Sequence, residues 1–331
     1  RLDRLRLAST TSLMSRRDVI IVASVSCIYN LGSPDDYQNY MVQLARGQKI
    51  ERDQVLAQLI SIQYERNDYE FARGKIRVRG DVVEIFPAYR QDALRIEFYD
   101  DEIEKIKQID PVSGDTISDL EKTAIYPAKH FLISPPRLND ALIEIDAELI
   151  QRLKELEGDG KLVEAQRLRS RTRYDMEMMK EIGTCKGIEN YSRVLSGRPA
   201  GAKPFCLIDY FPDDFITIID ESHVTVPQLN GMYEGDRSRK EMLVRHGFRL
   251  PSCLDNRPLK YHELKPMLKE TVYVSATPAP YERKEANGRI AELIIRPTGI
   301  IDPPIILKPT QGQVDDLIEL TRGRAARSER V

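Results

Sequence analysis

Two groups of polar residues follow apolar runs that are typical of strands buried in parallel β-sheets. The first group is Asp220-Glu221-Ser222-His223, which comes directly after the apolar run 215–219. The second group is Ser275-Ala276-Thr277-Pro278, which follows the run 271–274. Carboxylates at the C-terminal edge of a parallel strand lie where α/β folds bind nucleotides. The two groups together therefore indicate a nucleotide-binding edge of a sheet.

The residue types suggest the division of roles found in P-loop ATPases. Asp220 would hold Mg²⁺, usually through water, and Glu221 would polarise the attacking water. In helicase-type ATPases a Ser-Ala-Thr loop bonds to the acidic motif, so Ser275 and Thr277 would couple the nucleotide state to nucleic-acid binding. Each group also has an ordinary alternative, because an acidic pair can cap a helix and a Ser-Ala-Thr string can form a strand-end turn.

The phosphate-binding loop of such an ATPase, G-x-x-x-x-G-K-[ST], does not occur in the sequence. Gly160-Lys161 is the nearest candidate, but Glu155 stands at the first glycine position and Leu162 at the Ser/Thr position. Gly74-Lys75 fails at the same two positions. The sequence therefore predicts that this chain alone does not hydrolyse ATP.

The elements that would position these motifs begin near the N-terminus. An unbroken apolar run at 19–24 predicts a further strand that is buried on both faces. Ser33-Pro34 predicts the start of a helix, with serine as the N-cap and proline in the first turn. At the other end, residues 313–330 predict an amphipathic helix.

From residue 36 onward the pattern changes and predicts a small α+β insertion. Apolar residues at helical spacing predict a helix over 54–64. Short alternating runs then predict antiparallel strands at 75–81, 82–87, 94–98 and 102–106. The alternation places Ile76 and Val78 on one face of the sheet and Arg77 and Arg79 on the other.

Residues 137–181 predict two long helices, separated by Gly158-Asp159-Gly160. The second helix carries a run of arginines at every other position: Arg167, Arg169, Arg171 and Arg173. These arginines fit a solvated helix face paired with neighbouring acids, and they also fit a nucleic-acid contact.

The composition excludes several classes of protein. Lys and Arg together number 50 and Asp and Glu 52, so a net charge of −2 excludes a histone-like basic binder. The 4 cysteines lie far apart and the 4 histidines form no H-E-x-x-H motif, which argues against a zinc site. Such scattered cysteines are typical of reduced thiols in a cytosolic protein. The longest apolar run, 19–26, is too short to span a bilayer.

Several long strings, in order along nearly the whole chain, resemble the UvrB family of damage-verifying subunits in bacterial nucleotide excision repair. The first three are Ala23-Ser24-Val25-Ser26-Cys27-Ile28-Tyr29, Gln63-Tyr64-Glu65-Arg66-Asn67-Asp68 and Val78-Arg79-Gly80-Asp81-Val82-Val83. Further strings are Gly187-Ile188-Glu189-Asn190-Tyr191-Ser192-Arg193 and His246-Gly247-Phe248-Arg249-Leu250-Pro251-Ser252, together with the two polar groups above. Collinear strings of this length are more specific than any single motif.

The resemblance implies an α/β fold: an incomplete RecA-like P-loop NTPase domain of the helicase superfamily, with an inserted α+β domain and a helical subdomain. The expected segments are 1–35 (first RecA-like domain), 36–128 (insertion that interacts with UvrA), 129–200 (helical subdomain), 201–310 (rest of the first RecA-like domain) and 311–331 (start of the second).

The resemblance also implies the functional residues. Those for UvrA binding are Arg66, Arg77, Arg79, Arg95 and Glu97, and those for DNA are Lys186, Arg193 and Arg257. Asp220 would hold Mg²⁺ only together with ATP, and the ATP and Mg²⁺ belong to the full-length parent protein.

For the parent protein, the resemblance implies a cytoplasmic component of the UvrABC excinuclease. It would receive damaged DNA from UvrA, verify the lesion with ATP and recruit UvrC for incision, and it would also form a homodimer. The chain itself is expected to be an internal fragment without the Walker A loop, the β-hairpin, the second RecA-like domain and the UvrC-binding region.

Three interpretations of the fragment remain open. It would be a piece of the repair helicase that retains UvrA binding without ATP hydrolysis. Alternatively, it would be a non-catalytic UvrA-binding module like that of the transcription-repair coupling factor, although the intact Asp220-Glu221 pair argues against that origin. The third interpretation is a truncated chain that folds poorly, apart from its contiguous insertion.

Overall fold

The computed structural model describes residues 2–131, 135–295, 299, 301 and 303–331. It divides into two units, Arg1–Glu282 and Arg283–Val331. Residue 1 of the predicted segment 1–35 and residues 132–134 of segment 129–200 lie outside the described residues. The same holds for residues 296–298, 300 and 302 of segment 201–310.

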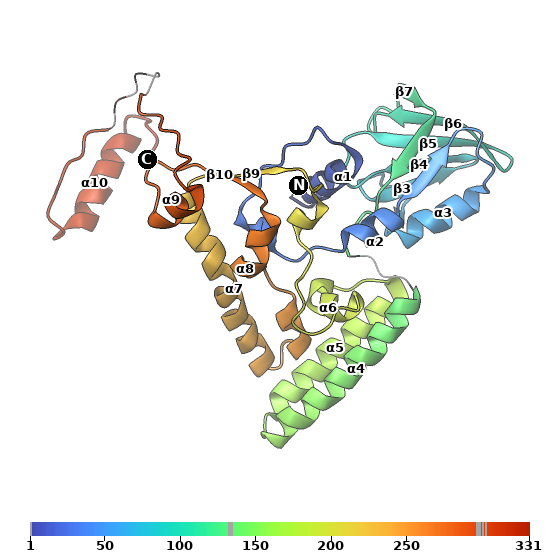
Figure 1. The fold of residues 1–331 in the computed structure, drawn as a ribbon. Coiled ribbons are helices and arrows are strands. Elements are labelled where there is room, and N and C mark those ends of the chain that lie inside the picture. The colour runs from blue at the N-terminus through green and yellow to red at the C-terminus, as the bar shows by residue number, and fades with distance from the viewer. Residues whose placement is uncertain (1, 132–134, 296–298, 300, 302) are drawn as a thin grey trace. The chain divides into compact units, whose positions relative to one another are not determined.

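The first unit holds most of the helices (Figure 1). They are α1 (Leu2–Ser15), α2 (Pro34–Asn39), α3 (Arg52–Ser61), α4 (Pro135–Gly158), α5 (Leu162–Ile182), α6 (Ser192–Leu195), α7 (Ser222–Arg245) and α8 (Tyr261–Leu264). Short 3₁₀ segments cover Val25–Ile28, Ile188–Tyr191, Leu207–Tyr210, Pro251–Asp255 and Lys265–Met267. Helix α9 (Pro280–Ala286) begins in the first unit, and α10 (Gln313–Ala325) lies in the second.

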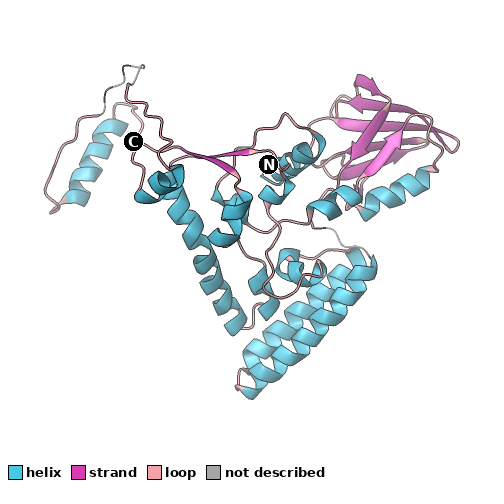
Figure 2. Cartoon of the chain, viewed as in Figure 1, coloured by secondary structure: helices cyan, strands magenta, loops and turns pink. Residues whose placement is uncertain are grey.

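The described strands form three sheets, of which the largest is the six-stranded sheet in Figure 2. Its order is β2-β3-β4-β5-β6-β7, with bounds Glu65–Arg66, Lys75–Arg79, Val82–Phe86, Ala93–Tyr99, Glu102–Ile109 and Thr116–Leu120. Within this sheet, β2 and β3 are parallel and the other neighbouring strands are antiparallel. Two-stranded sheets join β1 (Val42–Ala45) to β8 (Lys122–Ile125), antiparallel, and β9 (Ile216–Ile219) to β10 (Glu270–Tyr273), parallel.

One face of the six-stranded sheet packs on α3. Its apolar residues include Ile76, Val83 and Ile96, and they form one core with Val55 and Leu59 of α3. The alternation of apolar and polar residues in the sequence therefore matches the pleat, and the strands predicted at 75–106 are confirmed as β3 to β6. The predicted helix start at Ser33 is also confirmed, because its side chain accepts a hydrogen bond from the Asp36 backbone N–H at 3.3 Å.

Helices α4 and α5 form the predicted helical pair. Ala141, Ile145 and Leu149 of α4 share a core with Ala165 and Leu168 of α5. The break falls at 159–161, one residue later than the Gly-Asp-Gly string at 158–160 predicted. None of the described helices is both long enough and apolar enough to cross a membrane.

The strand predicted at 19–24 is wrong, because these residues are in an irregular conformation and Ile20 is 92% exposed. The predicted burial of the run 215–219 is also wrong for Ile216 and Ile218, which are exposed on β9. A run of β-branched residues becomes a buried strand only where other elements cover both of its faces. Among the described residues, β9 pairs with β10 alone.

The predicted C-terminal helix is shorter than the pattern indicated. Helix α10 ends at Ala325 rather than at residue 330. Ser328 has a left-handed backbone (φ +57°), which is incompatible with continuation of a right-handed helix.

Candidate functional sites

The face of the six-stranded sheet that is turned away from α3 carries charged side chains in register. Arg77, Glu84, Arg95 and Lys107 lie directly opposite one another on β3, β4, β5 and β6. The adjacent row is Arg79, Val82, Glu97 and Lys105. Four of the five residues expected to bind UvrA therefore share this surface, which we call the charged face: Arg77, Arg79, Arg95 and Glu97.

Glu84 lies at the centre of the charged face and links two of these arginines. Its side chain is only 6% exposed, and its Oε2 accepts a hydrogen bond from Arg77 Nε at 2.7 Å. Its Oε1 accepts hydrogen bonds from Arg95 Nε at 2.9 Å and from Arg95 Nη2 at 2.8 Å. Burial alone would raise the pKa of Glu84, but the two guanidinium groups outweigh it and hold the pKa below its usual value.

Glu84 is not among the site residues predicted from the sequence, although the sequence contains a signal for it. Glu84 is an acid inside the otherwise apolar run 82–86, at a position where period 2 places it on the same face as Val82. An acid in such a run needs a partner, because a buried carboxylate without one is strongly unfavourable.

Side chains beside the triad of Glu84, Arg77 and Arg95 also have fixed partners. Lys107 Nζ donates to Glu97 Oε1 at 2.7 Å, and the Arg77 guanidinium lies 4.4 Å from the centre of the Phe71 ring. Arg79 is exposed at the end of β3. The charged face thus combines fixed ion pairs with the exposed cation of Arg79.

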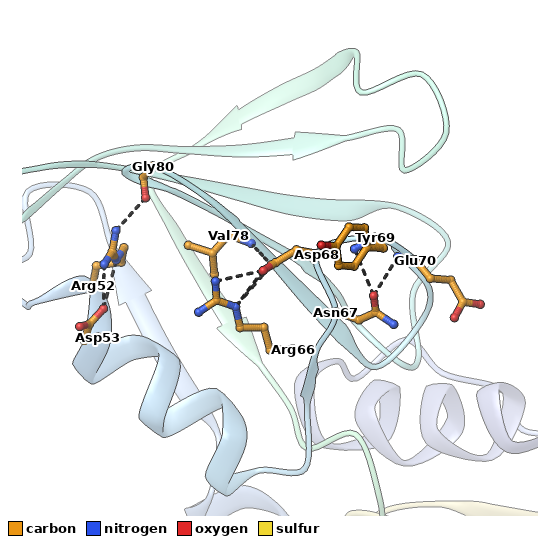
Figure 3. A network of polar contacts seen from close by, with 9 residues as sticks. All are labelled: Arg52, Asp53, Arg66, Asn67, Asp68, Tyr69, Glu70, Val78 and Gly80. Carbon is orange, nitrogen blue, oxygen red and sulfur yellow. Dashed lines mark hydrogen bonds and ion pairs between the residues drawn. The ribbon is translucent and has the colours of Figure 1, made fainter.

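Arg66 is not in the two rows of the charged face, because it lies in the edge strand β2, opposite Ile76. Figure 3 shows its side chain beside Asp68. Its Nη2 donates to Asp68 Oδ2 at 3.0 Å, and Asp68 Oδ1 accepts the Val78 backbone N–H at 2.9 Å. The hydrogen bond from Arg66, followed by that from Val78, lowers the pKa of Asp68. Arg66 is therefore held beside the sheet edge rather than on the charged face.

Hydrogen bonds from the backbone to a side chain fix the conformation of the loop after β2. Asn67 Oδ1 accepts the backbone N–H groups of Tyr69 at 3.1 Å and of Glu70 at 2.9 Å, as Figure 3 shows. Such an Asx turn fixes the local backbone. The side chain of Tyr69 is fully exposed on this turn.

The acidic motif lies in the short connection between β9 and α7. Asp220 Oδ1 accepts the Glu221 backbone N–H at 3.0 Å, and Glu221 has a left-handed backbone (φ +43°). Glu221 stands at the N-cap of α7 but makes no side-chain capping bond. The helix-cap alternative therefore does not account for its carboxylate, which is mostly exposed.

The Ser-Ala-Thr group lies beside the acidic motif. The Ser222 backbone N–H donates to the Val274 carbonyl at 3.0 Å, and Ser275 Oγ shares a hydrogen bond with His223 Nδ1 at 2.8 Å. Ser275 Oγ also accepts the Thr277 backbone N–H at 3.1 Å. The structure thus brings together the two polar groups that the sequence analysis singled out.

A second link between the two motifs involves Glu282, which the sequence analysis missed. The buried Ser222 Oγ donates to Glu282 Oε1 at 2.6 Å, and the Ala279 backbone N–H donates to Glu282 Oε2. One buried carboxylate therefore joins the start of α7 to the end of the Ser-Ala-Thr-Pro string.

Comparison with known proteins assigns both main parts of this structure. Residues 42–131, which contain the six-stranded sheet and α3, match the family described as UvrB interaction domain. Residues 136–197, which contain α5 and all but the first residue of α4, match the UvrB third helical domain. Both regions of the chain are thus similar to domains of UvrB.

Individual relatives match nearly the whole chain. The chain is 54% identical to UvrABC system protein B of Dehalococcoides mccartyi over 100% of its length and 50% of that protein. It is 57% identical to the namesake from Renibacterium salmoninarum (99% of the chain, 47% of the relative) and 56% identical to that from Geobacillus kaustophilus (99% and 50%). The chain spans about half the length of the curated relatives it matches.

The fit of Mg²⁺ and ATP to the residues of this chain is partial. Asp220 and Glu221 supply carboxylates of the kind that Mg²⁺ prefers. Within the described ranges, however, no three His, Cys, Asp or Glu side chains gather as a metal site. The sequence also lacks the loop that would hold the phosphates, so we derive no hydrolysis step from these residues.

The arginine run on α5 is mainly engaged in contacts within the fold. Arg169 pairs with Glu157 at 2.6 Å, and Arg171 pairs with the buried Asp175 at 3.0 Å. Arg167 donates to the His246 carbonyl at 2.6 Å. Two of the four arginines thus fit the paired-face alternative, Arg167 binds a backbone carbonyl, and Arg173 is exposed.

The three residues expected to contact DNA differ in accessibility. Lys186 is exposed, whereas Arg193 is largely buried and pairs with Asp255 at 3.2 Å. Arg257 is only 4% exposed and binds both oxygens of Glu263, at 2.7 and 2.8 Å. The burial of Arg257 argues against a direct phosphate contact, because its guanidinium is already paired in the interior.

The role of Glu282 leads to a stability prediction. In Glu282→Ala, the buried Ser222 hydroxyl and the Ala279 N–H lose their acceptor, so we expect the free energy of unfolding to fall by about 1–3 kcal/mol. Urea unfolding followed by circular dichroism measures this change. Glu234→Ala, at an exposed position of α7, is the matched control and should change stability by less than about 0.5 kcal/mol. Equal unfolding midpoints for the two variants would contradict the bridging role.

Proposed function

We propose that residues 42–131 form a UvrA-binding domain, and that the chain works as a UvrB-type component of nucleotide excision repair. The observation that carries this proposal is the match of these residues to the UvrB interaction domain. The name of the relatives, UvrABC system protein B, supports the assignment to that repair system.

The chemistry of the charged face supports a protein partner with acidic groups. Five cations and two carboxylates stand on its two central rows: Arg77, Arg79, Arg95, Lys105 and Lys107 against Glu84 and Glu97. Arginine forks bind carboxylates in a directed, bidentate way. Complementary charge across an interface also steers the encounter and fixes its register. The face therefore suits carboxylates on UvrA.

For the parent protein, we propose that β9, β10 and their motifs belong to a RecA-like nucleotide-binding core. Asp220 and Glu221 would face Mg²⁺ and ATP there, and Ser275 and Thr277 would couple nucleotide state to damaged DNA. The hydrogen bond between Ser275 and His223 supports this coupling. Contacts with UvrC and with a second copy also belong to this proposal, as does a DNA contact by Lys186 and Arg193.

A second candidate is a UvrA-binding module that has no ATPase activity. The sequence without a phosphate-binding loop favours this behaviour for the chain itself. The two candidates differ in their response to nucleotide. ATP would change the UvrA affinity of the repair helicase, but it would not change that of a UvrA-binding module.

The test of UvrA binding is a calorimetric titration of the chain into UvrA with the variant Arg79→Glu. Arg79 is exposed, so its reversal leaves the Glu84 triad intact and places a carboxylate against the acidic partner. We expect about 30-fold weaker binding, because one such charge reversal costs roughly 2 kcal/mol at an interface.

Arg46→Glu is the matched control for this titration. Arg46 is also exposed and belongs to residues 42–131, but it lies in the turn after β1 and pairs with Glu121. It should retain wild-type affinity. Unchanged affinity in Arg79→Glu, with circular dichroism showing a folded chain, would count against the charged face as the UvrA site.

A further inference from the structure

Glu84 is an unusual residue for the place it occupies. It stands between the buried Val83 and Ile85, and its own side chain is almost fully withdrawn from water. Transfer of a carboxylate from water into a protein is unfavourable unless it is paired and hydrogen-bonded. Buried ion pairs can often be replaced by apolar residues without loss of stability, so stability alone gives a weak reason for an acid here.

The geometry of the triad gives a better reason. Arg77 and Arg95 flank Glu84 directly in register on the two neighbouring strands, and each of the two carboxylate oxygens binds a different arginine. Without the carboxylate, two like charges would face each other across β4. With it, both guanidinium groups are hydrogen-bonded to one carboxylate on the sheet.

Both arginines nevertheless keep access to solvent. The Arg77 side chain is 18% exposed and that of Arg95 is 26% exposed. Arg77 is also restrained from the side by the Phe71 ring. The result is a pair of long side chains that are fixed in position while part of each remains open to a partner.

We propose that Glu84 is a positioning residue for UvrA binding, which holds the partly exposed side chains of Arg77 and Arg95 so that they meet carboxylates of UvrA. This inference rests on the proposed function. Side chains that are already ordered lose less conformational entropy when they bind, so a fixed pair of forks binds more tightly than a mobile pair. Glu84 thus acts through the two arginines rather than by touching the partner.

The binding test compares Glu84→Gln with the wild-type chain. The amide keeps the size of the side chain but loses the charge that binds both guanidinium groups. We expect about tenfold weaker UvrA binding through faster dissociation, measured by surface plasmon resonance, and a steeper salt dependence because the face gains one net positive charge. Glu121→Gln removes the same charge from an exposed site between β7 and β8 and should bind like the wild type.

A second measurement reads the positioning directly in the chain without UvrA. In ¹⁵N NMR spectra of arginine Nε–H groups, Arg77 and Arg95 should exchange slowly with solvent in the wild type and fast in Glu84→Gln. Fast exchange of both groups in the wild-type chain would overturn the proposal, whatever the fold of the variant.

The outcomes separate this inference from the function on which it rests. Absence of UvrA binding by the folded wild-type chain would overturn the proposed function. Wild-type binding together with equal or tighter binding by Glu84→Gln would overturn only the positioning role. Weaker binding with faster Arg77 and Arg95 exchange would support both.

Discussion

Arg77→Glu is expected to lower the free energy of unfolding of the six-stranded sheet by about 3–5 kcal/mol, the usual cost of breaking a buried ion pair. The new glutamate would face Glu84 directly across the β3–β4 ladder, at a pair of positions with little access to water. It would also remove the cation that lies against the Phe71 ring. Arg95 alone would then have to neutralise Glu84.

Urea unfolding of the 331-residue chain, followed by far-UV circular dichroism, measures this loss. Arg79→Glu is the matched control, because it makes the same change two residues further along the same strand at an exposed position. We expect the control to unfold within about 0.5 kcal/mol of the wild type. If Arg77→Glu were as stable as the control, the triad would not hold the sheet together. The comparison also explains why Arg79, rather than Arg77, is suited to a binding test.

Much of the interaction domain could be predicted from the sequence, because local periodicity determines it. Strict alternation at 75–79 reflects a sheet with one apolar and one polar face, and the helix before it shows helical spacing. The break between α4 and α5 follows from glycine in the same local way. In these segments each short stretch contains the information for its own conformation.

The pairing of residues on the charged face could not be predicted, because it depends on information that short stretches of sequence do not contain. Alternation places Arg77 and Arg79 on one face, but which residue faces Arg77 is set by the register between strands. Glu84 became visible as its partner only when that register was known. The role of the face in binding UvrA stays a prediction, since the structure shows its geometry and not its partner.

Burial is the property that the apolar runs predicted least well. The runs at 19–24 and 215–219 have the composition of buried strands, yet Ile20 and Ile218 are exposed. Conversely, arginine is a residue type that usually lies at the surface, yet Arg257 is buried and pairs with Glu263. Both errors have one cause: burial depends on what packs against a segment, and that is decided by residues far away in the sequence.

Gly247→Ala is expected to be among the most destabilising single changes in the first unit. Gly247 has a left-handed backbone (φ +67°), and a Cβ there would lie 2.3 Å from the Glu164 carbonyl oxygen and 2.9 Å from its Cα. Since both contacts are with backbone, no side-chain rotation relieves them. We expect a loss of about 2–5 kcal/mol in the free energy of unfolding, from backbone strain together with overpacking.

The site matters because it joins two helices that are distant in sequence. The chain passes Gly247 just after α7 and there meets the first two turns of α5, where Arg167 donates to the His246 carbonyl and lies over the Phe248 ring at 4.3 Å. The added methyl group would push this segment away from α5 and disturb both contacts. Leu250, just beyond, belongs to the core of the helical pair and would move with it.

Gly160→Ala is the matched control for the backbone strain. Gly160 has a similar left-handed backbone (φ +73°) but an added Cβ would meet nothing within 4 Å. Its variant should therefore lose only the strain, about 1–2 kcal/mol. Urea unfolding of the two variants separates strain from steric overlap, and equal losses would mean that the contact between Gly247 and α5 yields at little cost. A larger loss for Gly247→Ala would show that this close backbone approach fixes α7 against the third helical domain, because only that variant creates the overlap.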